Sequence, residues 1–187
     1  MRRLIVVLLS GVMLAPGHVE AQGITARQVV LQQKDLPQNV LVRAQTHKIK
    51  GYGPCTSGYQ SVFGSGLGGT QAVDSFAYQC PSADVAAQQY TSFASFYEQY
   101  YHRSGWHFAL LPDLRAGAQH AAWFNRGNLG ADDMNGHATQ SSQITLVFQR
   151  DAFIVFLQIT FEGESLPAAE RAARRLGHLM NRRIVSG

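Results

Sequence analysis

The chain is poor in charged residues, and its charges nearly balance. Charged residues make up 15% of the 187 residues, and the formal net charge is +4. A basic excess this small gives only a weak preference for anionic partners, so we expect no nucleic-acid partner. Gln, Ser, Ala and Gly are abundant instead. The polar surface should therefore be largely uncharged.

Beyond its first residues, the chain lacks an apolar run long enough to cross a membrane. A spanning helix needs about 20 consecutive apolar residues. The nearest later candidate, residues 144–161, is interrupted by Gln149, Arg150, Asp151 and Gln158. We therefore expect no stable membrane anchor in the mature protein.

Residues 1–21 have the three-part pattern of a secretory signal peptide. Two arginines precede an apolar core at residues 4–14, and Val19 and Ala21 occupy the positions before a cleavage site. We expect cleavage before Gln22 and a protein that is secreted or periplasmic. A permanent anchor is the alternative, but the apolar core is short for one.

Cysteine is scarce, with only Cys55 and Cys80 in the chain. No earlier cysteine is present, so the lipid acceptor of a bacterial lipoprotein is absent. In an oxidising compartment, two cysteines are expected to form one disulfide. On the chain-entropy model this bond would stabilise the fold by about 3 kcal/mol. A redox pair is the alternative, but the two residues do not form a C-x-x-C motif.

Residues 22–187 are expected to form a single domain, because about 165 residues suffice for one well-buried core. Extended segments are predicted at residues 40–49, 59–63, 73–80, 106–111, 119–125, 144–150 and 152–161. Helices are predicted from Ser82 to near Gly105 and from Leu166 onward. A polar loop is predicted at residues 126–140. The grouping predicts an α+β fold with an antiparallel sheet flanked by two main helices and one disulfide.

The first predicted helix is rich in aromatic residues. Spacings of three and four place one set on a common, sheet-facing side: Ala86, Tyr90, Phe93, Tyr97 and either Tyr100 or Tyr101. Phe96 and one of Tyr100 or Tyr101 must then flank the buried stripe. Packing of these rings, with the phenol tips in water, is one interpretation. The other is a ligand-binding pocket or interface that includes Tyr97, Tyr101 and Trp106.

The second predicted helix has a basic side opposite its apolar stripe. The basic residues are Arg171, Arg174, Arg175, His178 and Arg182. A solvated face is the simplest interpretation, and contact with an anionic membrane surface or polymer is the alternative.

No motif specifies a catalytic or cofactor site. Residues 64–69 match G-x-G-x-x-G, but the segment that follows is predicted to be a strand and not a helix, which favours a turn. The histidines lack metal-ligand spacing, so we expect no metal and no cofactor. No G-x-S-x-G elbow occurs, and no spacing pairs Glu98, Glu162 and Glu164. No catalytic residue is assigned.

Several short features together resemble a loose group of secreted bacterial domains. They are the Asp35-Leu36-Pro37 turn, the aromatic helix before Gly105-Trp106, the strand with Ala121-Ala122-Trp123, the hairpin from Val147 to Val155 and the closing Ala/Arg/Leu helix. The chain resembles uncharacterised exported domains and, more distantly, the LpqN and PsbP-like folds. The resemblance implies helices flanking an antiparallel sheet and an exported, ligand-sensing or scaffolding context.

We expect a secreted, non-enzymatic binding or sensor-type domain that uses an aromatic surface or groove. Its partner would be a small molecule, a polymer or a protein. The alternative is a secreted hydrolase whose site is assembled from distant residues. A deep polar pocket holding Ser, His and a carboxylate would favour the enzyme. An apolar groove beside Tyr97 to Trp106 would favour binding.

Overall fold

The computed structural model describes residues 23–36, 43–64, 72–103, 107–132, 138–161 and 166–187. The predicted signal peptide and Trp106 lie outside the described residues, and so does the side chain of Tyr101.

Seven strands form one antiparallel sheet. The strands are β1 (Arg43–Ile49), β2 (Ser57–Gly64), β3 (Ala72–Gln79), β4 (His107–Leu110), β5 (Gln119–Asp132), β6 (Ala138–Arg150) and β7 (Phe153–Phe161). Their order across the sheet is β1-β2-β3-β7-β6-β5-β4, and every neighbouring pair is antiparallel. Strands β1–β3 and strands β4–β7 are thus two meanders that meet where β3 pairs with β7.

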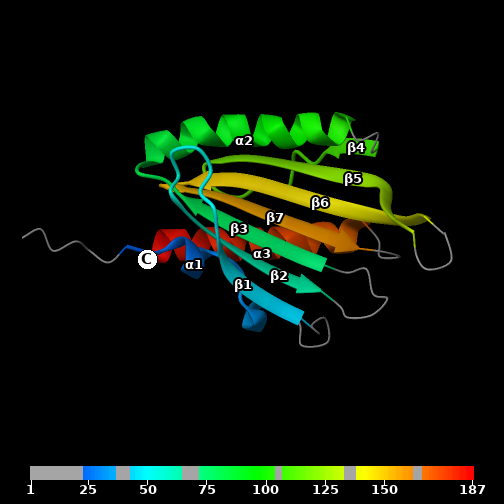
Figure 1. The fold of residues 1–187 in the computed structure, drawn as a ribbon, viewed down its shortest axis with the longest axis horizontal. Helices are drawn as coiled ribbons and strands as arrows, with labels where there is room; N and C mark the ends of the chain where they lie inside the picture. Colours follow the sequence, from blue (N-terminus) through cyan, green and yellow to red (C-terminus); the bar gives the residue numbers. More distant parts are fainter. Residues whose placement is uncertain (1–22, 37–42, 65–71, 104–106, 133–137, 162–165) are drawn as a thin grey trace, which may run out of the picture.

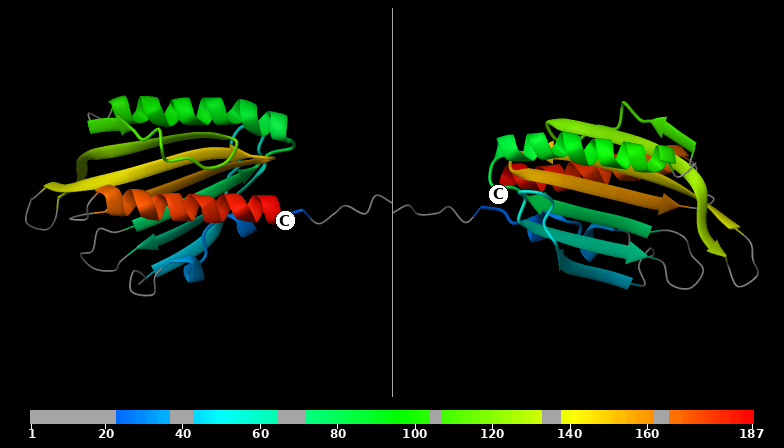
Figure 2. Two further views of the ribbon diagram at one scale, coloured as in Figure 1. Left: turned by 180° about the vertical axis from the view of Figure 1, so that it is seen from behind. Right: turned by 45° about the horizontal axis from the view of Figure 1, so that its top comes forward.

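Two long helices cover opposite faces of this sheet (Figures 1 and 2). Helix α2 (Ala83–Arg103) connects the two meanders across one face, and α3 (Leu166–Ser186) follows β7 and covers the other. A short helix, α1 (Ala26–Val29), lies on the α3 side, where it contacts α3, β2 and β3. The predicted α+β class with two main flanking helices is confirmed.

The α3 side has a largely aliphatic core. Buried side chains recur along α3 at spacings of three and four: Ala169, Ala173, Leu176, Met180 and Ile184. Gly177 allows this helix to approach the sheet closely, because an added Cβ would lie 2.6 Å from Cδ2 of Leu146. The segment around α1 adds Val29, Val30 and Leu31, which are completely buried.

An ion pair attaches the N-terminal segment to α3. The Arg183 guanidinium donates to both carboxylate oxygens of Asp35 at 2.8 and 2.7 Å, and to the Val30 carbonyl at 2.9 Å. Both charged side chains are largely buried. Sequence patterns did not indicate that residues 23–36 belong to the core.

The α2 side has a largely aromatic core. Phe93 of α2 lies among rings from the sheet and the β1–β2 loop: Tyr52, Phe76, Tyr78 and Phe156. The predicted disulfide Cys55–Cys80 is confirmed and is buried in this cluster. It ties the β1–β2 loop to the residue that follows β3.

The prediction of a polar loop at residues 126–140 is wrong over most of that range. Strand β5 continues to Asp132, and β6 already begins at Ala138. Arg126 pairs with Ser142 and Asn128 pairs with Gln140, with a register shift beyond Asn128. Backbone hydrogen bonding extends this hairpin, and such bonding does not require the apolar alternation from which strands are recognised.

Candidate functional site

Part of the sheet is left uncovered on the α2 side. Helix α2 packs on β4, β5, β6 and β7 and reaches β3 through Phe93, which contacts Phe76 and Tyr78, whereas no described helix covers β1 and β2 on that face (Figure 1). We call the α2-side surface of β1, β2, β3 and the adjoining β7 the open face. Its side chains follow from the register, because directly opposed residues of antiparallel strands point to the same side.

A row of polar side chains crosses the open face. Gln60 of β2 donates from Nε2 to the two carboxylate oxygens of Asp74 in β3, at 3.0 and 2.8 Å. Asp74 is paired in register with Gln158 of β7. Nε2 of Gln158 donates to Oε1 of Gln143 in β6 at 2.8 Å. We call Gln60, Asp74, Gln158 and Gln143 the polar track.

Asp74 is the charged member of the track, and it lies in an apolar register. Its neighbours two residues on along the same face are Phe76 and then Tyr78. Burial raises the pKa of Asp74 above its usual range, while the Gln60 hydrogen bond and the charge of His47 act in the opposite direction. Burial also raises the pKa of Tyr78, with Tyr52 and Asp74 adding to the rise. Asp74 is therefore a carboxylate whose ionised form burial disfavours, an effect for which the Gln60 hydrogen bond partly compensates.

Beside the track, Gly58 of β2 leaves room for two neighbouring side chains. A Cβ on Gly58 would lie 2.8 Å from Cγ1 of Ile49 and 2.9 Å from Cδ1 of Tyr78. The bare backbone of β2 thus lets these two side chains pack over it. The aromatic core consequently extends from α2 as far as β2.

Aromatic side chains of α2 flank the open face. Phe96 is 58% exposed and Tyr100 is 56% exposed, and their rings stack with centroids 6.5 Å apart and planes at 22°. Tyr97 turns inward, with its ring centroid 4.7 Å from that of Phe156. We call Phe96, Tyr97 and Tyr100 the aromatic flank. The prediction that Phe96 and one of the two tyrosines lie beside the buried stripe is confirmed.

The exposed rings lie on the side of α2 that faces β1–β3. Gln89 precedes Phe96 by two helical turns and so lies on the same side of α2. Its Oε1 would be 2.6 Å from a Cβ placed on Gly53, in the β1–β2 loop. Phe96 therefore stands beside the open face and not on the side of α2 that faces β4.

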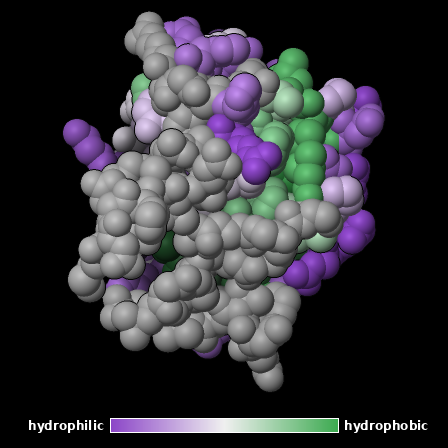
Figure 3. Space-filling view, turned by 90° about the vertical axis from the view of Figure 1, so that its right-hand side faces the viewer, coloured by the Kyte–Doolittle hydropathy of each residue, from purple (hydrophilic) through white to green (hydrophobic). Residues whose placement is uncertain are grey.

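Hydrophobic surface is also exposed at the end of the molecule toward which α2 runs. Figure 3 looks at this end and shows hydrophobic surface beside hydrophilic side chains. Leu110, the last residue of edge strand β4, is 62% exposed. The register places Leu110 opposite Trp123, on the α2 side of the sheet.

The predicted ligand-binding residues are only partly placed. Tyr97 lies between α2 and the sheet, as part of the aromatic flank. Tyr101 is placed by its backbone in α2 alone, and Trp106 is outside the described residues. A site formed by all three residues therefore stays a prediction.

Sequence reasoning missed the polar track. Its members come from four strands, and only the register brings them together. One signal was present, because the alternation in residues 73–80 puts Asp74 on the side of Phe76 and Tyr78. A carboxylate on the same face as two aromatic residues is stable there only if it has a hydrogen-bonding partner.

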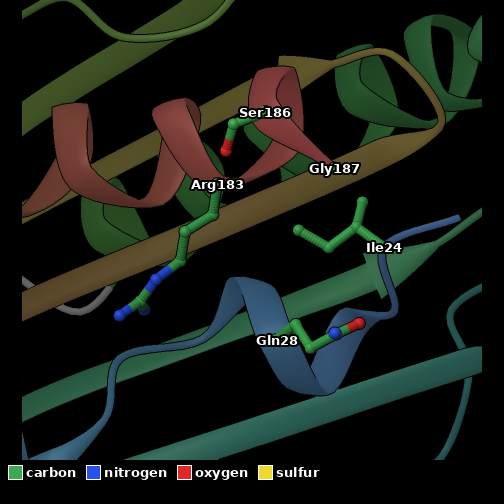
Figure 4. A pocket seen from close by; sticks show the side chains of 5 residues that line it. All are labelled: Ile24, Gln28, Arg183, Ser186 and Gly187. Carbon is green, nitrogen blue, oxygen red and sulfur yellow. The ribbon is translucent and has the colours of Figure 1, made fainter.

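A separate shallow pocket of about 220 Å³ lies between α1 and the last turn of α3. Ile24 and Gln28 face Ser186 and Gly187 across it, and Arg183 completes the lining (Figure 4). Arg183 is already engaged by Asp35. The lining includes no histidine, aspartate or glutamate side chain, so this pocket does not provide the group of side chains that a hydrolase requires.

The part of the chain that the structure describes contains no group of three or more His, Cys, Asp or Glu side chains that could hold a metal ion. No helix in it is long and apolar enough to cross a membrane.

Comparisons with known proteins do not identify a relative. The chain matches no protein-family model, and no curated protein or solved structure matches it. The resemblance to LpqN and PsbP-like domains therefore stays a prediction. Function has to be inferred from the geometry.

Proposed function

We propose that the protein is a non-enzymatic binding domain that acts outside the cytoplasm, with the open face and the aromatic flank as its binding surface. The observation that carries this proposal is the exposed, stacked pair Phe96 and Tyr100 beside the open face. Aromatic side chains combine a large apolar area with a rigid shape, and they dominate binding surfaces for that reason.

Folding alone gives little reason for these exposed rings. The inward side of α2 already packs through Ala86, Tyr90 and Phe93, which are buried. Burying a whole Phe side chain is worth about 1.5–3 kcal/mol, and Phe96 forgoes much of that gain in the free protein. A ligand that covers the pair recovers it.

The buried disulfide supports the proposed location. Cys55–Cys80 is fully enclosed by the aromatic core, and disulfides of this kind persist in oxidising compartments. The predicted signal peptide points to the same place. The arrangement of helices on both faces of an antiparallel sheet also agrees with what the resemblance to exported domains implies.

The test compares the double variant Phe96→Ser/Tyr100→Ser with wild type and with Val185→Ser. Val185 is 57% exposed on α3, so its variant removes apolar surface on the opposite face. Both variants should keep the wild-type melting temperature within about 3 °C, since exposed side chains contribute little to stability. Binding would be measured by calorimetry against neutral oligosaccharides, short peptides and phospholipid vesicles.

The proposal requires one of these probes to bind wild type and Val185→Ser saturably and to lose at least about tenfold in affinity in the double variant, about 1.4 kcal/mol. Equal binding by all three proteins, or no saturable binding to any probe, contradicts it.

A further inference from the structure

We propose that the ligand of the open face is a neutral glycan, held by side-chain hydrogen bonds from the polar track and stacked against the aromatic flank. This inference rests on the proposed binding function and specifies its ligand class. The juxtaposition that carries it is a row of amides and one carboxylate beside the aromatic flank: Tyr97 contacts Phe156, which precedes Gln158 by two residues on the same face of β7.

The hydrogen-bonding groups of the track match sugar hydroxyls. A hydroxyl both donates and accepts, and an amide side chain offers donors and an acceptor together. An ionised carboxylate has about four lone-pair positions, and Gln60 approaches both oxygens of Asp74 from one side. Positions remain on Asp74 for ligand hydroxyls. Gln60, Asp74 and Gln158 are all partly exposed, so they can be reached from solvent.

The charge of the open face favours an uncharged ligand. On β1 from Gln45 to Ile49, and on β2, β3 and β7, the described side chains of this face include no lysine or arginine. Four exposed arginines, Arg171, Arg174, Arg175 and Arg182, lie on α3, which covers the other face of the sheet (Figure 2). Among the described side chains of this face, the imidazole of His47 is the cationic group that acts on Asp74. The Asp74 carboxylate would repel an anionic polymer, whereas it does not repel a neutral chain.

The direction of the track favours a glycan over an extended peptide. Peptides that pair with sheets do so along an edge strand, through backbone hydrogen bonds. The accessible part of the track instead crosses β2, β3 and β7 on the face of the sheet, a span of about 10 Å at the usual strand spacing. All its donors and acceptors are side chains. A short stretch of sugar units lying across the strands reaches them and leaves its ring faces available to Phe96 and Tyr100.

The test uses neutral hexasaccharides of β-1,4-linked glucose and of β-1,4-linked N-acetylglucosamine as probes. In the full protein, Asp74→Asn removes the charged acceptor with almost no change in shape. We expect saturable binding by wild type and at least about a tenfold loss of affinity in this variant. The melting temperature should not fall, because a charge that burial disfavours has been removed. Asp113→Asn, at an exposed position on a turn beside α3, is the matched control and should bind like wild type.

A measurement on the wild-type protein makes the test independent of the variants. The side-chain amide signals of Gln60 and Gln158 in ¹⁵N NMR spectra should shift when a hexasaccharide is added. The side-chain amide signal of Asn181, which lies in α3 on the other side of the sheet, should not shift. Hexasaccharide binding that leaves the signals of Gln60 and Gln158 and the affinity of Asp74→Asn unchanged overturns the assignment of the track. If peptides or vesicles bind through Phe96 and Tyr100 while neither hexasaccharide binds, the glycan inference fails and the proposed binding function stands. If no probe depends on Phe96 and Tyr100, the proposed function itself fails.

Discussion

The two sides of the sheet are built from different chemistry. On the α3 side, aliphatic residues fill the core, and the outward surface of α3 is rich in arginine. On the α2 side, aromatic residues and a disulfide fill the core, and the described part of α2 exposes few charges and two stacked rings. The α3 side is closed by the N-terminal segment, whereas on the α2 side no described helix covers β1 and β2. This contrast is the basis of the proposal that the α2 side binds a ligand, while the closed α3 side stabilises the fold.

The largest expected effect is the loss of the ion pair that closes the α3 side. Arg183→Met should destabilise the protein by about 3–5 kcal/mol, because it leaves the largely buried carboxylate of Asp35 without its partner. Unfolding in urea measures this change. Arg182→Met is the matched control, since Arg182 is exposed, and it should change stability by less than about 0.5 kcal/mol. The double variant Arg183→Met/Asp35→Leu should recover much of the loss. If Arg183→Met has the same free energy of unfolding as wild type, the ion pair does not close the α3 side.

The disulfide tests the α2 side in the same way, with a slightly smaller expected effect. Replacing Cys55 and Cys80 together by serine should cost about 3 kcal/mol by the chain-entropy model. The two serines would also lie in an aromatic core, where hydroxyls need partners. Thermal unfolding without reductant measures the loss. A melting temperature equal to that of wild type would show that the α2 side does not depend on this bond.

The smallest effect concerns Asp74 and pH. Because burial raises the pKa of Asp74 in the folded protein, the ionised carboxylate costs stability above that raised pKa. The cost declines as the pH falls from the raised pKa and is gone below the ordinary value of 3.8. Asp74→Asn should therefore melt slightly higher than wild type near neutral pH, and the difference should vanish in acid. Melting curves across pH measure this, with Asp113→Asn as the control. A difference that grows in acid would contradict the sign.

The parts of the fold that could be predicted are those with local signals. The helix after Ser82, the helix from Leu166 and the hairpin at Arg150-Asp151 follow from capping, proline placement and β-rich runs within a few residues. The disulfide followed from a count of two cysteines. These features need no knowledge of distant partners.

The parts that could not be predicted depend on partners far apart in the chain. Residues 23–36 belong to the core because α3 receives them, and the Asp35–Arg183 contact spans 148 positions. The long β5–β6 hairpin depends on backbone pairing through polar residues such as Asn128 and Gln140. The polar track requires the register of four strands at once. Of the candidate site, only the aromatic flank could be read from helical spacing.

The pairing of β3 with β7 has a consequence for how the protein folds. Each meander joins strands that are close in sequence, but Ala72 pairs with Thr160 and Gln79 with Phe153 at the centre of the sheet. The chain between β3 and β7 must close into a long loop before their contacts form, which is entropically costly. We therefore expect the pairing of β3 with β7 to limit the folding rate. Cys55 lies in the β1–β2 loop and Cys80 directly follows β3, so the disulfide can form within the first meander alone. Most of the chain must be present before the sheet itself is complete.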